Sequence, residues 1–148
     1  MSMNSLITRS TCPLSNTLDV IGDKWSLLIV RDLFIGRKTY SEMLGSPEKI
    51  ATNILVSRLK KLVDMEIVDF HKVKGDAKTK HYYLTDKGID LYPIMLQMSL
   101  WKRKHMSELE THPLGLELFE NIDRRGVSDL YQKAAAHQRS QREELLSH

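Results

Sequence analysis

The sequence predicts a mostly helical α+β domain that carries one β-hairpin. Two observations lead to this class: apolar residues recur at helical spacing over most of the chain, and their period changes to two only once, between about residues 67 and 85. With 148 residues, 41% of them apolar, the chain can bury the core of one domain. We expect an N-terminal arm at 1–11, the domain at 12–106 and a helical extension at 107–148, for which dimerisation is one candidate role.

Charge and composition narrow the class of protein. Residues 1–106 hold 17 basic and 11 acidic residues, whereas residues 107–148 hold 5 basic and 8 acidic residues. The excess of basic residues therefore lies within residues 1–106. This asymmetry of charge suggests that residues 1–106 bind a polyanion. The longest aliphatic run, residues 27–30, is far shorter than the roughly 20 residues of a membrane span, and no signal peptide is evident, so we expect a cytoplasmic protein. A single cysteine excludes an internal disulfide framework.

Capping signals place the first three helices. Pro13 suits the first position of a helix that should run to Ile21 and stop at Gly22. Asp23 can cap a second, largely apolar helix over residues 24–34. Thr39 and Glu42 form a capping box, which predicts a short third helix from Tyr40 to Leu44.

The fourth helix follows a tight turn and has one unusual face. Apolar residues at 55, 59, 62 and 63 recur at i, i+4, i+7 and i+8, which fixes the inner face. No Asp or Glu occurs from Lys49 to Val63. The outward positions are therefore small, polar or basic, namely Asn53, Ser57, Lys60 and Lys61, with Ile54 and Arg58 at one border.

The hairpin is recognised by its alternation. Val68 and Phe70 alternate with polar residues, the turn centres on residues 75–76, and Tyr82 and Leu84 alternate on the return. Because an isolated two-stranded ribbon is marginal in water, its apolar side should lie on the helices.

Two further helices are expected. One should run from Thr85 and Asp86 to about His105, bent by Pro93, and its apolar residues cover more of the circumference than one domain face can bury, which favours a partner helix. Another should span residues 128–146. The residues expected at a subunit interface are Leu14, Leu18, Met95, Met98 and Trp101.

Three helices, a fourth after a short turn, a basic hairpin and a long closing helix follow the order of a winged helix-turn-helix domain with a β-hairpin wing. In this arrangement the fourth helix enters the DNA major groove, where a carboxylate would repel phosphate. We expect Asn53 and Ser57 to reach base edges. The full set of expected DNA-binding residues is Arg37, Lys38, Thr39, Thr52, Asn53, Ser57, Arg58, Lys60, Lys61, Lys72, Lys74, Lys78 and Lys80.

Three segments resemble the HxlR-type family of bacterial transcriptional regulators. They are "CPLSNTLDVIGDKWSLLIVRDLFIGRKTYSEM", "IATNILVSRLKKLVDMEIV" and "YYLTDKG", which resemble that family's opening, its recognition helix and the exit of its wing. The resemblance covers residues 12–105 and implies a homodimeric winged-helix repressor or activator that binds double-stranded DNA. His81 stands where the family often carries an acidic residue. Because some members use an N-terminal cysteine as a redox or quinone sensor, the resemblance also makes Cys12 a candidate sensor.

Several alternatives stay open at this point. Cys12 precedes a helix N-terminus, where the dipole can favour a thiolate, but it can equally be a small capping residue that senses nothing. Trp25 can belong to the core or line an effector pocket. The six histidines lack metal-ligand spacing, and no catalytic or phosphate-binding motif is present, so we expect no metal, no cofactor and no enzyme activity. The remaining alternatives are a winged-helix protein-interaction module and a PadR-type or MarR-type regulator with a small-molecule effector.

Overall fold

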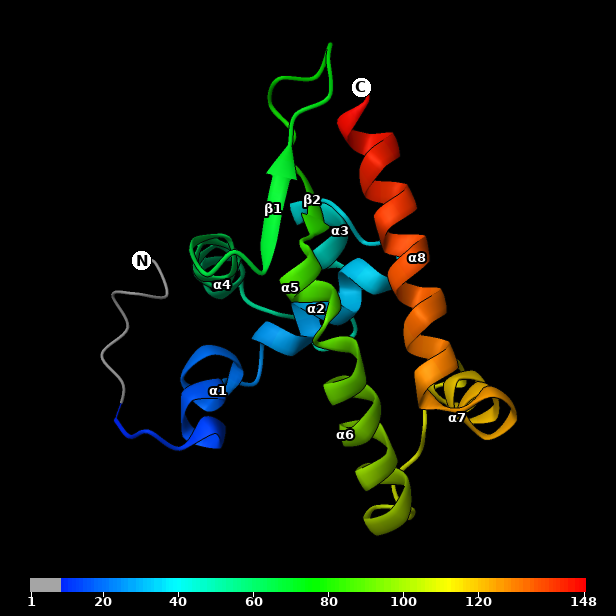
Figure 1. The fold of residues 1–148 in the computed structure, drawn as a ribbon. Coiled ribbons are helices and arrows are strands. Elements are labelled where there is room, and N and C mark those ends of the chain that lie inside the picture. The colour runs from blue at the N-terminus through cyan, green and yellow to red at the C-terminus, as the bar shows by residue number, and fades with distance from the viewer. Residues whose placement is uncertain (1–8) are drawn as a thin grey trace.

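The computed structural model describes residues 9–148, which form eight helices and one two-stranded antiparallel sheet (Figure 1). Residues 1–8 of the expected arm lie outside the described residues. In chain order the elements are α1 (Pro13–Ile21), α2 (Ser26–Phe34), α3 (Tyr40–Leu44), α4 (Thr52–Asp64), β1 (Val68–His71), β2 (His81–Leu84), α5 (Asp86–Ile89), α6 (Tyr92–His105), α7 (Pro113–Arg125) and α8 (Val127–Leu146).

The predicted caps form the first three helices. Pro13 occupies the first turn of α1. The carboxylate of Asp23 accepts hydrogen bonds from the amides of Trp25 and Ser26 at 3.0 Å each, in the turn before α2. Helix α2 begins at Ser26, two residues later than predicted, with Trp25 at its N-cap. The Thr39 hydroxyl accepts from the Glu42 amide and donates to the Glu42 carboxylate, so the capping box at α3 is confirmed.

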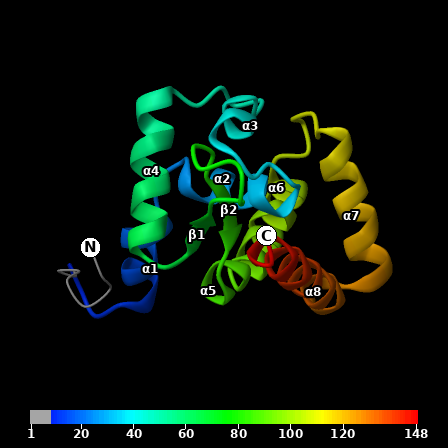
Figure 2. The ribbon, with the colours of Figure 1, turned by 90° about the horizontal axis from the view of Figure 1, so that it is seen from above.

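The core lies where α2, α3, α4 and the sheet meet. Leu55, Leu59 and Leu62 are buried along one side of α4, as their spacing predicts, and they join Val30 of α2 and Met43 of α3 in one apolar cluster. Seen from above in Figure 2, α4 runs along one edge of the molecule, and the hairpin lies between it and α8. The core thus holds α4 by its inner face and leaves its outer face free of packing.

The hairpin forms in the segment where the alternation predicts it. Val68 pairs with Leu84 and Phe70 with Tyr82, and these residues turn their apolar side to the core. On its other edge, β2 is held by the Lys38 carbonyl, which accepts a 2.8 Å hydrogen bond from the Tyr82 amide. Gly88 of α5 lies so close to the sheet that a Cβ atom there would meet the Ile67 carbonyl oxygen at 2.2 Å. This close approach fixes α5 directly behind the hairpin.

The prediction of a single helix from Thr85 to His105 is wrong, because two helices, α5 and α6, occupy this segment. Pro93 lies in the first turn of α6, where its missing N–H costs no hydrogen bond, and a turn at Asp90 and Leu91 separates the two helices. The proline therefore starts a helix instead of bending one. Helix α7 was not predicted as a separate element, and Pro113 again occupies a first turn.

The predicted C-terminal helix is confirmed as α8, and it packs on its own chain. The Gln138 side chain donates to the Phe34 carbonyl at 3.3 Å, and Arg142 donates to the Leu84 carbonyl at 3.1 Å. At the far end of α8, the His148 carbonyl accepts from the Lys74 amide at 3.1 Å. Figure 1 shows α8 running beside the hairpin toward its tip. Among residues 9–148, no helix has the length and apolar character needed to cross a membrane.

Candidate nucleic-acid interface

The outer face of α4 is an open, mostly polar surface. Its exposed residues are Thr52, Asn53, Val56, Ser57 and Lys60. Lys60 pairs with Asp64 at 2.9 Å, one helical turn further on, and this hydrogen bond is the main cause that lowers the pKa of Asp64. The face free of carboxylates thus extends over the first three turns of α4 and ends at the Lys60–Asp64 pair.

Two basic residues of α4 do not point outward. Arg58 Nε donates to the Asp23 carboxylate at 3.0 Å, and Lys61 Nζ donates to the Asp19 carbonyl at 3.4 Å. Partial burial alone would raise the pKa of Asp23, but hydrogen bonds from Ser26, from the Trp25 amide and from Arg58 outweigh it and lower this pKa to about 2. Asp23 is therefore ionised at neutral pH and joins the start of α2 to the middle of α4.

The basic residues before α3 are also engaged within the chain. Arg37 Nη1 lies 3.2 Å from Asp32 Oδ1, and Lys38 lies beside Gln138 and Arg142 of α8. The Thr39 hydroxyl is engaged in the hydrogen bonds of the capping box. All three side chains remain partly exposed, at the start of the short helix that precedes the turn into α4.

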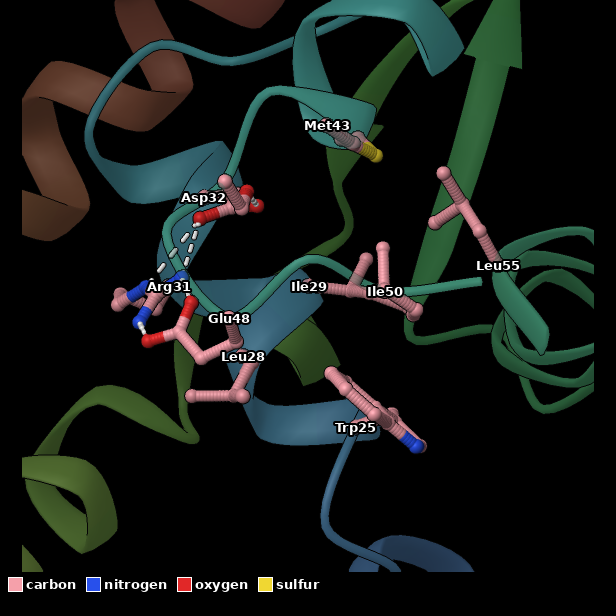
Figure 3. Close-up of a pocket in the computed structure, with 10 residues that line it drawn as sticks. Trp25, Leu28, Ile29, Arg31, Asp32, Met43, Glu48, Ile50 and Leu55 are labelled. Carbon is pink, nitrogen blue, oxygen red and sulfur yellow. Dashed lines mark hydrogen bonds and ion pairs between the residues drawn. The ribbon is translucent and has the colours of Figure 1, made fainter. Parts of the chain in front are cut away.

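A buried carboxylate holds that turn in place (Figure 3). Asp32 has a side-chain exposure of 4%, accepts a hydrogen bond from the Ser46 hydroxyl, and pairs with Arg31 at 2.9 Å. Arg31 also binds Glu48 through two 2.7 Å hydrogen bonds, which are the main cause that lowers the pKa of Glu48. Ser46 and Glu48 belong to the turn between α3 and α4, whereas Arg31 and Asp32 belong to α2. The network therefore ties this turn to α2 and fixes where α4 begins.

Trp25 lines a small pocket next to this network, together with Leu28, Ile50 and Leu55 (Figure 3). The tryptophan is half-buried and packs against the core cluster. The core interpretation of Trp25 is thus supported by its packing.

The hairpin tip carries the other basic surface, which we call the wing lysines: Lys72, Lys74, Lys78 and Lys80, all exposed. Gly75 makes the turn with φ +93°, and Asp76 accepts from the Thr79 amide at 3.2 Å. Lys80 Nζ lies 4.4 Å from the centre of the Phe70 ring, which orients one lysine at the base of the tip. The loop therefore presents several cations and only one carboxylate, and Asp76 uses that carboxylate to close the turn.

Cys12 and the apolar residues expected at a subunit interface lie away from the wing. Cys12 is exposed at the N-cap of α1, and its carbonyl accepts from the Asn16 amide at 3.0 Å. Leu14 and Leu18 of α1 are exposed, as are Met98 and Trp101 of α6, whereas Met95 is half-buried against the core. Figure 1 shows α1 and α6 at the end of the molecule opposite the wing tip. Within the part of the chain that the structure describes, no three His, Cys, Asp or Glu side chains gather closely enough to hold a metal ion.

The sequence comparison assigns the family. Residues 20–110 match the model of the HxlR-like helix-turn-helix. The chain belongs to the HxlR family. Its helix-turn-helix is α3 and α4, the hairpin is its wing, and the chain is therefore a helix-turn-helix transcriptional regulator.

Individual relatives agree with this assignment. The HTH-type transcriptional regulator YybR of Bacillus subtilis is 33% identical over 104 residues, which are 68% of this chain and 81% of YybR. The structure of PA1607 has a TM-score of 0.63 and 36% identity, and covers 70% of this chain and 72% of PA1607. The structure of reduced YodB of B. subtilis has a TM-score of 0.56 and 27% identity, and covers 68% of this chain and 100% of YodB. A structure of YodB with quinone bound is also known. Among the bacterial relatives matched, the shared region spans 62% to 92% of the relative's own length.

Sequence reasoning missed the partners of the basic residues on α4. Asp64 could have been found, because it follows Lys60 at the i+4 spacing that pairs side chains on a helix. Asp23 and the Asp19 carbonyl are 35 and 42 residues from their partners, and no local pattern connects them.

Proposed function

We propose that this HxlR-family regulator binds DNA sequence-specifically as a homodimer and represses the genes that it controls, acting in the cytoplasm. The observation that carries the proposal is the carboxylate-free outer face of α4, which lies next to a wing with four exposed lysines. A twofold dimer presents two copies of α4 to successive major grooves. Its operator is then pseudo-palindromic, with half-sites about one helical turn or a multiple of it apart.

The residues divide by the chemistry of their exposed atoms. Asn53 is suited to adenine because an amide can form two hydrogen bonds with its major-groove edge, and Ser57 and Thr52 can reach neighbouring edges. Lys60 and the wing lysines supply charge to phosphates. Arg37, Lys38 and Thr39 lie at the start of α3, where they support a backbone contact. Arg58 and Lys61 act mainly by holding α4 against α1 and the turn that follows it.

The dimer is supported by exposed apolar side chains on α1 and α6. Trp101 is 60% exposed and Leu14 66% exposed, values that are unusual for large apolar residues without a partner. Replacing Trp101 with Glu should convert the dimer to monomer in sedimentation equilibrium. Ile35→Glu, at a 48% exposed position at the C-cap of α2 and outside α1, α6 and the C-terminal extension, is the matched control and should leave the dimer intact.

The binding proposal is tested by operator selection followed by a salt series. Lys60 and the wing lysines of two subunits could neutralise about ten phosphates, which gives a slope of log K against log salt near about −9. A slope shallower than about −3, or a failure to retard duplex DNA of any sequence, would reject DNA binding and favour a protein-interaction module. A promoter carrying the selected operator should drive a reporter more strongly when the gene for this chain is deleted.

A response to oxidants or electrophiles is a second proposal, carried by the exposed thiol of Cys12 at the N-cap of α1. The related YodB has been solved with quinone bound. A quinone would form a C–S bond with the Cys12 thiolate and take up a proton at oxygen. Diamide would instead oxidise two thiols to a disulfide, and because this sequence has one cysteine, the second thiol would come from the other subunit or a small thiol.

The response to quinone separates a sensor from a passive cap. Benzoquinone should weaken operator binding by the wild type and leave binding by Cys12→Ser unchanged. Equal binding by the wild type with and without quinone would refute the sensor role.

A further inference from the structure

Helix α4 has two flanks, and contacts within the chain identify one of them. Arg58 donates to Asp23 at 3.0 Å, in the turn between α1 and α2, and Lys61 donates to the Asp19 carbonyl of α1 at 3.4 Å. We call this the α1 flank. It is closed to a ligand, because both side chains that line it are bound to the chain itself.

Val56 lies on the opposite flank. At about 100° per residue it is about 200° around the helix from Arg58 and about 140° from Lys61. In Figure 1, α1 lies on one side of α4 and the hairpin rises on the other. Val56 therefore projects on the side to which the wing extends, between Thr52 and Lys60, which precede and follow it by one turn and are also exposed.

The side chain of Val56 has no packing role in the chain. It is 56% exposed, whereas the leucines that anchor α4 are exposed by 3% or less. Valine also favours a helix slightly less than alanine or lysine does, so neither burial nor helix propensity accounts for it at this position. It is an apolar group at the edge of the polar face that we assign to the major groove.

We propose that Val56 reads a thymine through its C5-methyl group and thereby sets one base preference in each half-site. The inference rests on the proposed DNA binding and adds a specificity-determining residue to it. The thymine methyl is the apolar group that base pairs present in the major groove, and small aliphatic side chains recognise it by contact. Asn53 and Thr52 beside it offer hydrogen bonds, so the three residues would read neighbouring base pairs by different chemistry.

The experiment removes only the methyl group. In the selected operator, each thymine is replaced in turn by deoxyuridine, symmetrically in both half-sites, and binding is measured by fluorescence anisotropy. Burial of one methyl changes binding about fourfold per half-site. Wild type should therefore lose affinity at one symmetric pair of thymines, and Val56→Ala should bind thymine and deoxyuridine there about equally. Leu116→Ala, at a 57% exposed position on α7, should keep the wild-type response.

The outcomes separate this inference from the proposal beneath it. If no operator can be selected, DNA binding itself fails. If wild type binds a selected operator but no thymine methyl matters, or if Val56→Ala retains the wild-type sensitivity at every thymine, the role of Val56 is refuted while DNA binding stands. Because Val56 is exposed, its alanine variant should keep the helical circular dichroism of the wild type, so a lost response reports a lost contact.

Discussion

The Asp23→Asn substitution tests how α4 is held. Asp23 caps α2 and pairs with Arg58 of α4 at 3.0 Å, and its side chain is only 20% exposed. An asparagine keeps an oxygen for the cap, since Asn and Asp are similar N-cap residues. The substitution removes the negative charge, which weakens the hydrogen bonds from the Ser26 hydroxyl and the two amides and also the pair with Arg58. We expect a folded but less stable protein in which α4 is held less firmly.

The size of the effect follows from the pKa of Asp23. Its fall from 3.8 to about 2 in the folded protein corresponds to about 2.4 kcal/mol of unfolding free energy at neutral pH, which solvent screening reduces to about 1–2 kcal/mol. Because the folded pKa is the lower one, this stabilisation is present above about pH 4 and is lost as the pH falls toward about 2, with about half left at pH 3.

Urea unfolding, followed by circular dichroism at several pH values, measures this difference. Asp23→Asn should be less stable than the wild type by about 1–2 kcal/mol at pH 7, and this difference should halve near about pH 3 and vanish as the pH falls to about 2 and below. Glu117→Gln, an exposed carboxylate on α7, should show no such difference. An unchanged urea midpoint at pH 7, or a stability difference that does not shrink in acid, would refute the assigned role of Asp23.

Three further predictions concern other parts of the structure. Asp32→Asn should lower the free energy of unfolding by about 2–3 kcal/mol, because it leaves Ser46 and Arg37 without the buried carboxylate they bind; urea midpoints measure this. Arg142→Ala should speed hydrogen exchange in α8, because it removes the hydrogen bond to the Leu84 carbonyl and the pair with Asp86, whereas Lys133→Ala on the exposed side of α8 should not. Lys74→Gln and Lys78→Gln should each weaken binding to all DNA sequences alike and reduce the salt slope of a dimer by up to about two, and a loss confined to the operator would contradict a phosphate contact.

Local sequence signals predicted much of the fold. The bounds of α1 and α3 and the position of the hairpin each follow from residues a few positions apart. Capping boxes, first-turn prolines and alternating apolar residues act over one or two turns of chain, so they can be read without a structure. The buried side of α4 was predictable for the same reason.

The parts that could not be predicted depend on distant partners. Pro93 was predicted to bend a helix, but it starts one, because the outcome depends on whether the preceding residues pack as a turn. The docking of α8 needs Gln138 to meet Phe34 and Arg142 to meet Leu84, over separations of 104 and 58 residues. The DNA-binding roles assigned to residues from sequence stay predictions, but the free side chains among them are now known.

These positions imply that different basic residues of the domain provide affinity for DNA and hold α4 in its orientation. Charge that is already paired with Asp23 gains little from a phosphate, because the arginine would have to give up one anion for another. Substituting Arg58 should therefore lower both the free energy of unfolding and the affinity for the operator, because α4 would no longer be held to Asp23. Substituting Lys74 or Lys78, which are exposed at the tip of the wing, should lower affinity alone. A ratio of stability loss to affinity loss, measured for both kinds of variant, separates the residues that hold the reading helix from those that hold the DNA.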